Sequence, residues 1–316
     1  MPGLAVALAL LVALAVIYWI SGALRPTTLP EYASSPRQIT GMALMLILVP
    51  VYLVAAASLA ERRSLALVEE IRAGLTDSTE ADAAVRAILD GLRRTWLPGS
   101  AAGLAMGMLN TQLIAAFTGS NPILEGTISL GQLLMWWLVG LLLGVRIETS
   151  RAFRQLGAVV ELDLFHLGRL RALARSGIID VVIIAGALLL TPLQSLDAEF
   201  RWYNYQSALL VALPAAAFFL IWPLQPLHRR NRAERDTRLA AVESQLETLA
   251  PAAPNRPEAS AQLEALLSHR DRLRALRTWP LSTGLLSRVA LYLVIPPLAW
   301  AGAALVERVV NQLLEP

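Results

Sequence analysis

The sequence predicts an all-α integral membrane protein: a bundle of about seven transmembrane helices joined by helical cytoplasmic loops. Composition supports this prediction, because 56% of the 316 residues are hydrophobic and only 16% are charged. Soluble domains carry about 25% charged residues. The order of the residues supports it as well, because the apolar residues occur in uncharged runs close to the ~20 residues that cross a bilayer as a helix.

Seven windows have the length and apolarity of membrane spans: 4–24, 39–60, 97–117, 128–146, 178–195, 204–224 and 281–306. The first lacks a basic leader and its apolar stretch is too long for a signal peptide, so we expect it to remain as a span. Polar residues interrupt or border the third and fifth windows, at Asn110-Thr111-Gln112 and at Asp180 respectively.

Arginine placement predicts the orientation of these spans. Three of the intervening loops, 61–95, 146–177 and 228–278, hold 6, 6 and 10 arginines, whereas the three alternate loops hold 2, 0 and 1. Basic residues accumulate in cytoplasmic loops. The bias therefore predicts a protein of the cytoplasmic (inner) membrane, with the N-terminus inside and the C-terminus outside.

Three regions follow from this topology. Residues 1–227 are expected to form a six-span membrane region with amphipathic cytoplasmic loops at 61–95 and 146–177. Residues 228–278 are expected to form a cytoplasmic helical hairpin, and residues 279–316 the seventh span and an extracytoplasmic tail. The hairpin is predicted from leucines and a valine at helical spacing on both sides of a proline-rich break: Leu239, Val242, Leu246, Leu249, Leu263, Leu266, Leu273 and Leu276.

The residue inventory excludes several kinds of chemistry. All 27 basic residues are arginine, so a Walker A loop, a kinase lysine and a Schiff base are ruled out. The chain has no cysteine and only three scattered histidines, which argues against thiolate and histidine metal sites. We therefore expect no enzymatic activity, no cofactor and no bound metal, and nothing indicates nucleic-acid binding.

A stripe of glycines predicts close helix packing. Gly99, Gly103 and Gly107 recur every fourth residue in the third window, and Gly140 and Gly144 share this spacing in the fourth. Small residues at this spacing let two membrane helices approach closely. Two interpretations remain open: packing within one subunit, or a subunit interface in a homo-oligomer.

Three polar residues lie near these stripes. Asn110 or Thr111 continues the face of Gly107, and Gln132 precedes Gly140 by eight residues. Polar side chains at membrane depth usually face protein or a cavity. They are predicted either to form interhelical hydrogen bonds or to line a polar permeation path.

Two further features concern the last span. Pro296 and Pro297 each remove a helical hydrogen bond near mid-membrane, so this point is either a static kink or a hinge. Asp180 and Arg288 are charges set inside the cytoplasmic ends of the fifth and seventh windows. They are either independent interface residues or an ion pair between these spans.

Arg229, Arg230 and Arg232 directly follow the sixth window. This cluster is expected to anchor the topology, with anionic lipid headgroups as a second interpretation.

The C-terminal half resembles a group of uncharacterised bacterial and archaeal multi-pass membrane proteins. The segments that carry the resemblance are FRQLGAVVELDLFHLGRLRALARSG (153–177), IWPLQPLHRRNRAERDTRL (221–239) and HRDRLRALRTWPLSTGLLSRVALYLVIPPLAW (269–300). The resemblance implies a shared architecture. It implies no particular activity and no functional residues.

Two functions are expected from these features. The first is an oligomeric ion channel or channel-like transport protein of the inner membrane. The alternative is a non-transporting membrane scaffold or signalling adaptor that acts through its cytoplasmic helices. The expected partners are the lipid bilayer, further copies of the chain and a cytoplasmic protein.

Overall fold

The computed structural model describes residues 2–25, 36–72, 75, 78–111, 121–160, 171–195, 203–249 and 257–276, with positions 279, 284, 287–292, 294–295, 298 and 302. Within these ranges all regular structure is helical. The helices are α1 (Pro2–Ile20), α2 (Pro36–Arg72), α3 (Ser78–Leu89), α4 (Gly91–Asn110), α6 (Pro122–Val159), α7 (Arg171–Leu190), η3 (Thr191–Ser195), α8 (Tyr203–Ile221), η4 (Trp222–Leu224), α9 (Gln225–Leu249) and α10 (Pro257–Ala275).

Within the described ranges, five helical stretches are long and apolar enough to cross a membrane: Gly3–Ile20, Arg37–Arg72, Pro122–Val159, Ala172–Gln194 and Gln206–Leu249. They coincide with five of the seven predicted windows. Of the window 97–117, α4 covers the part up to Asn110, and residues 112–117 lie outside the described residues. The window 281–306 is described only at isolated positions, so a count of seven spans stays a prediction.

The longest helices continue past the ends of their apolar windows. At 1.5 Å per residue, the 37 residues of α2 and the 38 of α6 reach about 55 Å, whereas the apolar core of a bilayer is about 30 Å thick. The predicted loops 61–95 and 146–177 therefore begin as continuations of α2 and α6. Neither junction contains a glycine or proline that would stop the helix, so α2 runs on to Arg72 and α6 to Val159.

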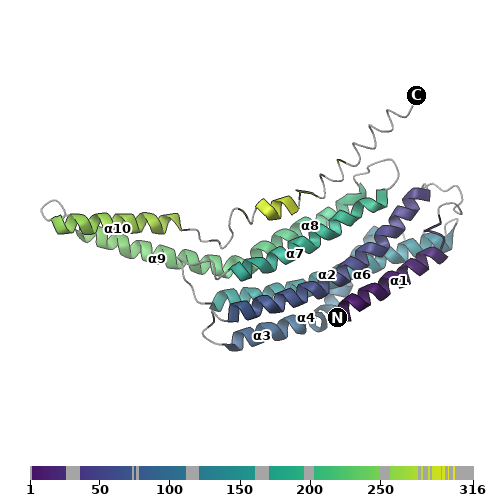
Figure 1. Cartoon of the computed structure of the whole chain (residues 1–316), viewed down its shortest axis with the longest axis horizontal. Helices are drawn as coiled ribbons and strands as arrows, with labels where there is room; N and C mark the ends of the chain where they lie inside the picture. Colours follow the sequence, from purple (N-terminus) through teal and green to yellow (C-terminus); the bar gives the residue numbers. More distant parts are fainter. Residues whose placement is uncertain are drawn as a thin grey trace, which may run out of the picture.

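The helices form an elongated bundle (Figure 1). α4 packs along α6, α1 along α2, and α7 along both α2 and α8. The hairpin of α9 and α10 projects from one end of this bundle (Figure 1). We call this end the hairpin end.

A compact apolar cluster, the junction core, lies at the hairpin end where α2, α3, α6, α7 and α9 meet. Its buried members are Leu67, Val68, Ile71, Ala81, Ala84, Ile88, Ala152, Phe153, Leu156, Val160, Ala172, Leu173, Ala174, Leu224 and Leu227. Burying one large aliphatic side chain contributes about 1.5–3 kcal/mol. The junction core therefore binds the extended helix ends into one packed unit.

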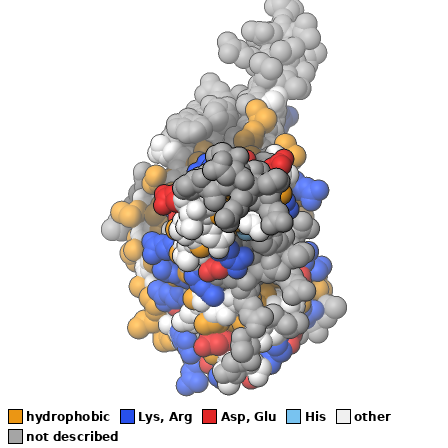
Figure 2. All heavy atoms as spheres, turned by 90° about the vertical axis from the view of Figure 1, so that its left-hand side faces the viewer, with side chains coloured by type: hydrophobic (Ala, Val, Ile, Leu, Met, Phe, Trp, Pro, Cys, Tyr) orange, Lys and Arg blue, Asp and Glu red, His pale blue; other side chains and the backbone are white. Residues whose placement is uncertain are grey.

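The hairpin holds its two arms together with few buried side chains. Val242 of α9 and Leu273 of α10 are buried, and Arg274 Nη2 lies 3.0 Å from Glu243 Oε1 across the arms. The view onto this end of the molecule shows basic and acidic side chains intermixed (Figure 2). The hairpin is thus a short, highly charged two-helix element.

Candidate functional site

Several polar side chains are buried among the apolar helices next to the junction core. On α6, Arg146, Glu148, Thr149 and Ser150 have at most 8% of their surface exposed. Burying a polar group costs free energy unless it is hydrogen-bonded, and burying a charge costs more unless it is paired. Glu148 pairs with Arg151 and Thr149 donates to Val145 O inside α6, whereas the side chain of Arg146 donates to residues of other helices.

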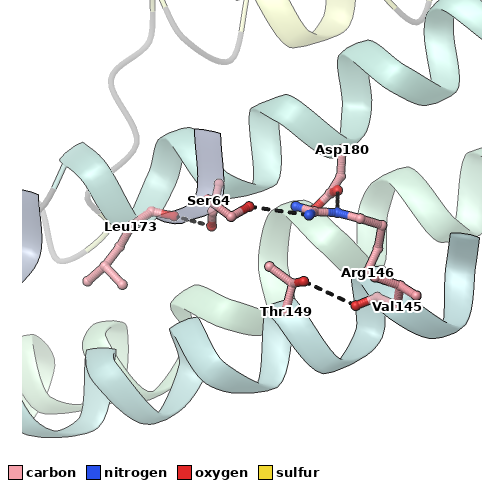
Figure 3. A network of polar contacts seen from close by, with 7 residues as sticks. Ser64, Val145, Arg146, Thr149, Leu173 and Asp180 are labelled. Carbon is pink, nitrogen blue, oxygen red and sulfur yellow. Dashed lines mark hydrogen bonds and ion pairs between the residues drawn. The ribbon is translucent and has the colours of Figure 1, made fainter. Parts of the chain in front are cut away.

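Arg146 and Asp180 form a buried ion pair between α6 and α7 (Figure 3). Arg146 Nε donates to Asp180 Oδ1, and the two side chains are 4% and 3% exposed. Arg146 Nη1 also donates to Ser64 Oγ of α2 at 3.2 Å. One guanidinium thus connects α2, α6 and α7, and removal of either charge would leave the other buried without compensation.

The structure gives Asp180 a partner that neither interpretation of the sequence named. The carboxylate pairs with Arg146, while Arg288 is exposed. The sequence did carry a signal for the observed pair. Arg146 ends one apolar window and Asp180 begins the next, and consecutive antiparallel spans place these positions at the same end of the bundle.

Arg146 also borders a cavity. Within the described residues, Arg146 Nη2 is buried and has no hydrogen-bond partner. Arg146 lines a cavity of about 400 Å³ between α2 and α6, together with Ser58, Glu61, Arg62 and Thr149 and with apolar side chains. Arg146 Nη2 is thus a polar donor without a partner, on a residue that lines a cavity.

A second cavity of about 800 Å³ lies between α2 and α7. Its wall is mostly apolar, and Arg62, Arg63, Glu70 and Arg175 line its polar end. Arg62 and Ser58 line both cavities, so the two lie on either side of this part of α2.

The predicted glycine stripe of α4 packs against another helix of the same chain, α6. A Cβ on Gly103 would lie 2.5 Å from Trp136 O, and a Cβ on Gly99 would lie 2.9 Å from Gly140 O. Real Cβ atoms are not found this close to backbone atoms. Gly99 and Gly103 therefore allow direct contact between the backbones of α4 and α6.

The remaining glycines complete the same contact. A Cβ on Gly107 would lie 2.8 Å from Leu133 Cδ1, and one on Gly144 would lie 3.0 Å from Thr95 Cβ. The structure thus shows the first interpretation, packing between two helices of one chain. A subunit interface in a homo-oligomer stays a prediction.

The three polar residues near the stripe do not come together around a path. Asn110 Nδ2 donates to Met106 O at 2.9 Å, and Thr111 Oγ1 to Gly107 O at 2.9 Å, both within α4 or at its end. Gln132 Nε2 faces Met42 Sδ at 3.8 Å. None of the three lines either cavity described above.

The arginine cluster after the sixth window divides into two roles. Arg230 Nη1 donates to Val160 O at 3.0 Å, next to the C-terminus of α6, where carbonyls lack helical partners. Arg229 and Arg232 are exposed, and Arg232 lies 3.7 Å from Asp236. Arg230 thus fixes the base of α9 to α6. The predicted hinge at Pro296 and Pro297 lies outside the described residues.

No group of acidic or histidine residues that would hold a metal ion is found in the part of the chain that the structure describes. Searches of family models, curated proteins and solved structures give no match to this chain. Inference about function therefore rests on the geometry of the chain itself.

Proposed function

We propose that the chain is a membrane scaffold or adaptor of the inner membrane that presents its α9–α10 hairpin to a cytoplasmic protein. In this proposal the chain has seven spans, with the N-terminus inside and the C-terminus outside. The arginine-rich ends of α2 and α6, the junction core and the hairpin then lie in the cytoplasm. The arginine bias of the loops supports this orientation.

The observation that carries the proposal is the rigid mounting of the hairpin. α9 follows the apolar helix α8 directly through the 3₁₀ turn Trp222–Leu224, so the apolar segment continues into the hairpin. Leu227 is fully buried in the junction core and Arg230 binds the end of α6. A linker would need no such bracing, whereas an element that presents a surface at a fixed position does.

The base of the hairpin has a second brace. The ring of His228 stacks on Trp279 with a centroid separation of 4.2 Å, which joins the start of α9 to the segment that follows α10. Both ends of the hairpin are thus held at the same place. This geometry supports a projecting element whose orientation is set by the bundle.

Site-specific photo-crosslinking in the native cells tests the adaptor function. A photoreactive amino acid at the exposed hairpin positions Glu247 or Glu264 should give one discrete adduct with another protein. The same amino acid at Leu210, which is 71% exposed on the apolar helix α8, serves as control. Hairpin positions that give no adduct beyond that of Leu210 would contradict the proposal.

Channel-like transport is the second candidate, and the cavity beside Arg146 favours it. The unpartnered Nη2 and the adjoining space would suit a small anion or water. The glycine stripe and its polar neighbours, which prompted this candidate, give it less support because their contacts lie within the chain. Ion flux through vesicles containing the purified full chain would favour transport; vesicles that stay sealed would favour the adaptor.

A further inference from the structure

The cavity between α2 and α7 is lined by both apolar and charged side chains, which is the lining that an amphiphilic ligand requires. Its apolar wall includes Tyr52, Leu59, Ile179 and Val182. Its charged lining residues are three arginines and a single glutamate. With a volume of about 800 Å³, it lies within the size range of pockets that hold small-molecule ligands.

Two polar contacts between α2 and α7 show how this cavity, which we call the groove, runs along the helices. At one end, Tyr52 Oη donates to Ile183 O at 3.1 Å. At the other end, Arg175 Nη1 donates to Glu70 Oε2 at 3.0 Å. The two helices therefore run antiparallel along the groove, which is apolar near Tyr52 and charged near Arg175.

The charged end carries unneutralised positive charge. Glu70 pairs with Arg175. Arg62 and Arg63 are exposed, and neither has an ion-pair partner among the described residues. Arginine presents several donors in a planar fork that suits phosphate oxygens. The end of the groove is thus electrostatically complementary to a phosphate group.

The spacing along α2 matches a lipid at the cytoplasmic surface. From Tyr52 to Arg62 the helix rises about 15 Å, half the thickness of the bilayer core. In the proposed orientation Arg62 lies where α2 leaves the membrane and Tyr52 lies at depth. An acyl chain would therefore follow the apolar wall while its headgroup meets the arginines.

We propose that this groove binds an anionic phospholipid, with its phosphate against Arg62 and Arg63 and an acyl chain along the apolar face of α2 and α7. The inference rests on the membrane insertion proposed above. It places the specific lipid site here instead of at Arg229 and Arg232, which are exposed on α9 and line neither of the two cavities.

Binding of phosphatidylglycerol and phosphatidylcholine to the purified full chain in detergent, followed by native mass spectrometry, tests the headgroup contact. The wild type should prefer phosphatidylglycerol. The double variant Arg62→Gln/Arg63→Gln should bind it roughly 30-fold more weakly, since each basic side chain near an anionic surface contributes about 1 kcal/mol. The matched control Arg229→Gln/Arg232→Gln removes the same charge from α9 and should retain the wild-type preference.

A second variant tests the acyl-chain contact. Val182 is 43% exposed and lines the groove, so Val182→Trp should fill the groove without disturbing the core. It should weaken phosphatidylglycerol binding although every arginine remains. Binding unchanged by Val182→Trp would mean that the arginines attract lipid only as surface charge, and would overturn the proposal.

Other outcomes would overturn it too. Equal binding of both lipids, or an unchanged preference in Arg62→Gln/Arg63→Gln, removes the headgroup site. Inorganic phosphate that displaces phosphatidylglycerol as well as free lipid does would show a phosphate site without a lipid. Failure of the adaptor proposal is separate, because it appears in crosslinking from Glu247 and Glu264 and leaves these lipid measurements unaffected. A wild-type chain that fails to fractionate with membranes would contradict both proposals.

Discussion

At the scale of single residues, Arg146 determines how α2, α6 and α7 meet. Its guanidinium contacts Asp180 and Ser64, and all three side chains are buried. Buried charges are rarely retained for stability, because apolar residues of the same volume often serve as well. In an apolar bundle they fix one arrangement of the helices, since any other arrangement leaves a charge without its partner.

Asp180→Ala should therefore destabilise the protein strongly. Removing one partner of a buried pair costs about 3–5 kcal/mol, because the remaining charge stays buried without compensation. Thermal unfolding of the detergent-solubilised chain measures the effect. The double variant Arg146→Met/Asp180→Leu should recover most of the loss, since it removes both charges.

Arg288→Gln is the control for this experiment. Arg288 is exposed and Asp180 has Arg146 as its partner, so the unfolding temperature should not change. A loss equal to that of Asp180→Ala would instead support the pair between Asp180 and Arg288 that the sequence suggested.

Part of this site could be predicted from the sequence. The polar break at Asp180 in an apolar window is visible in the sequence. Its partner is not, because the rotation of α6 about its axis decides whether Arg146 faces α7 or lipid. That rotation depends on packing around Gly99 and Gly103, which sequence spacing alone does not reveal.

At the scale of elements, the contact between α4 and α6 explains the glycine spacing. The backbones of these helices touch along Gly99, Gly103 and Gly140. In a membrane, close packing of backbones supplies the van der Waals contact that apolar burial cannot. The sequence predicted the close contact, but it could not show whether the partner helix belonged to the same chain.

Gly103→Ala tests this contact directly. The new methyl group would lie 2.5 Å from Trp136 O, and overpacking of this kind costs about 1–3 kcal/mol. The matched control is Gly284→Ala, where a Cβ meets nothing within 4 Å. The control should unfold at the wild-type temperature or above, whereas Gly103→Ala should unfold at a lower temperature. Equal unfolding temperatures for the two variants would contradict the observed packing.

The hairpin offers a second comparison of matched substitutions. Leu273 of α10 is fully buried, whereas Leu263 is half-buried. Leu273→Ala should cost about 2–5 kcal/mol of local stability and should raise amide hydrogen exchange in α9 and α10. Leu263→Ala should have a clearly smaller effect. Equal exchange in both variants would indicate arms that do not pack through Leu273.

The ends of α2 and α6 could not be predicted from the sequence, because both helices continue past their apolar windows. The charged residues after Ala60 and from Arg146 onward predict the start of cytoplasmic loops. Hydropathy locates the apolar core of a span, but a helix continues wherever its residues favour helix and pack against neighbours. The junction core supplies those neighbours for the ends of α2 and α6.

At the scale of the whole molecule, the structure combines an apolar bundle with a charged hairpin mounted on it (Figure 1). The proposed orientation places the junction core and the hairpin in the cytoplasm and the lipid groove at the inner membrane surface. Each of these proposals depends on which side of the membrane the hairpin occupies. The side occupied by the hairpin is therefore the central claim.

Cysteine accessibility tests this claim most directly, because the chain has no cysteine of its own. Ser244→Cys places one thiol on the exposed face of α9, and Pro316→Cys places one at the C-terminus. With a membrane-impermeant maleimide, Pro316→Cys should be labelled in intact cells, whereas Ser244→Cys should be labelled only after the cells are permeabilised. Labelling of Ser244→Cys in intact cells would contradict the cytoplasmic placement of the hairpin and the function proposed from it.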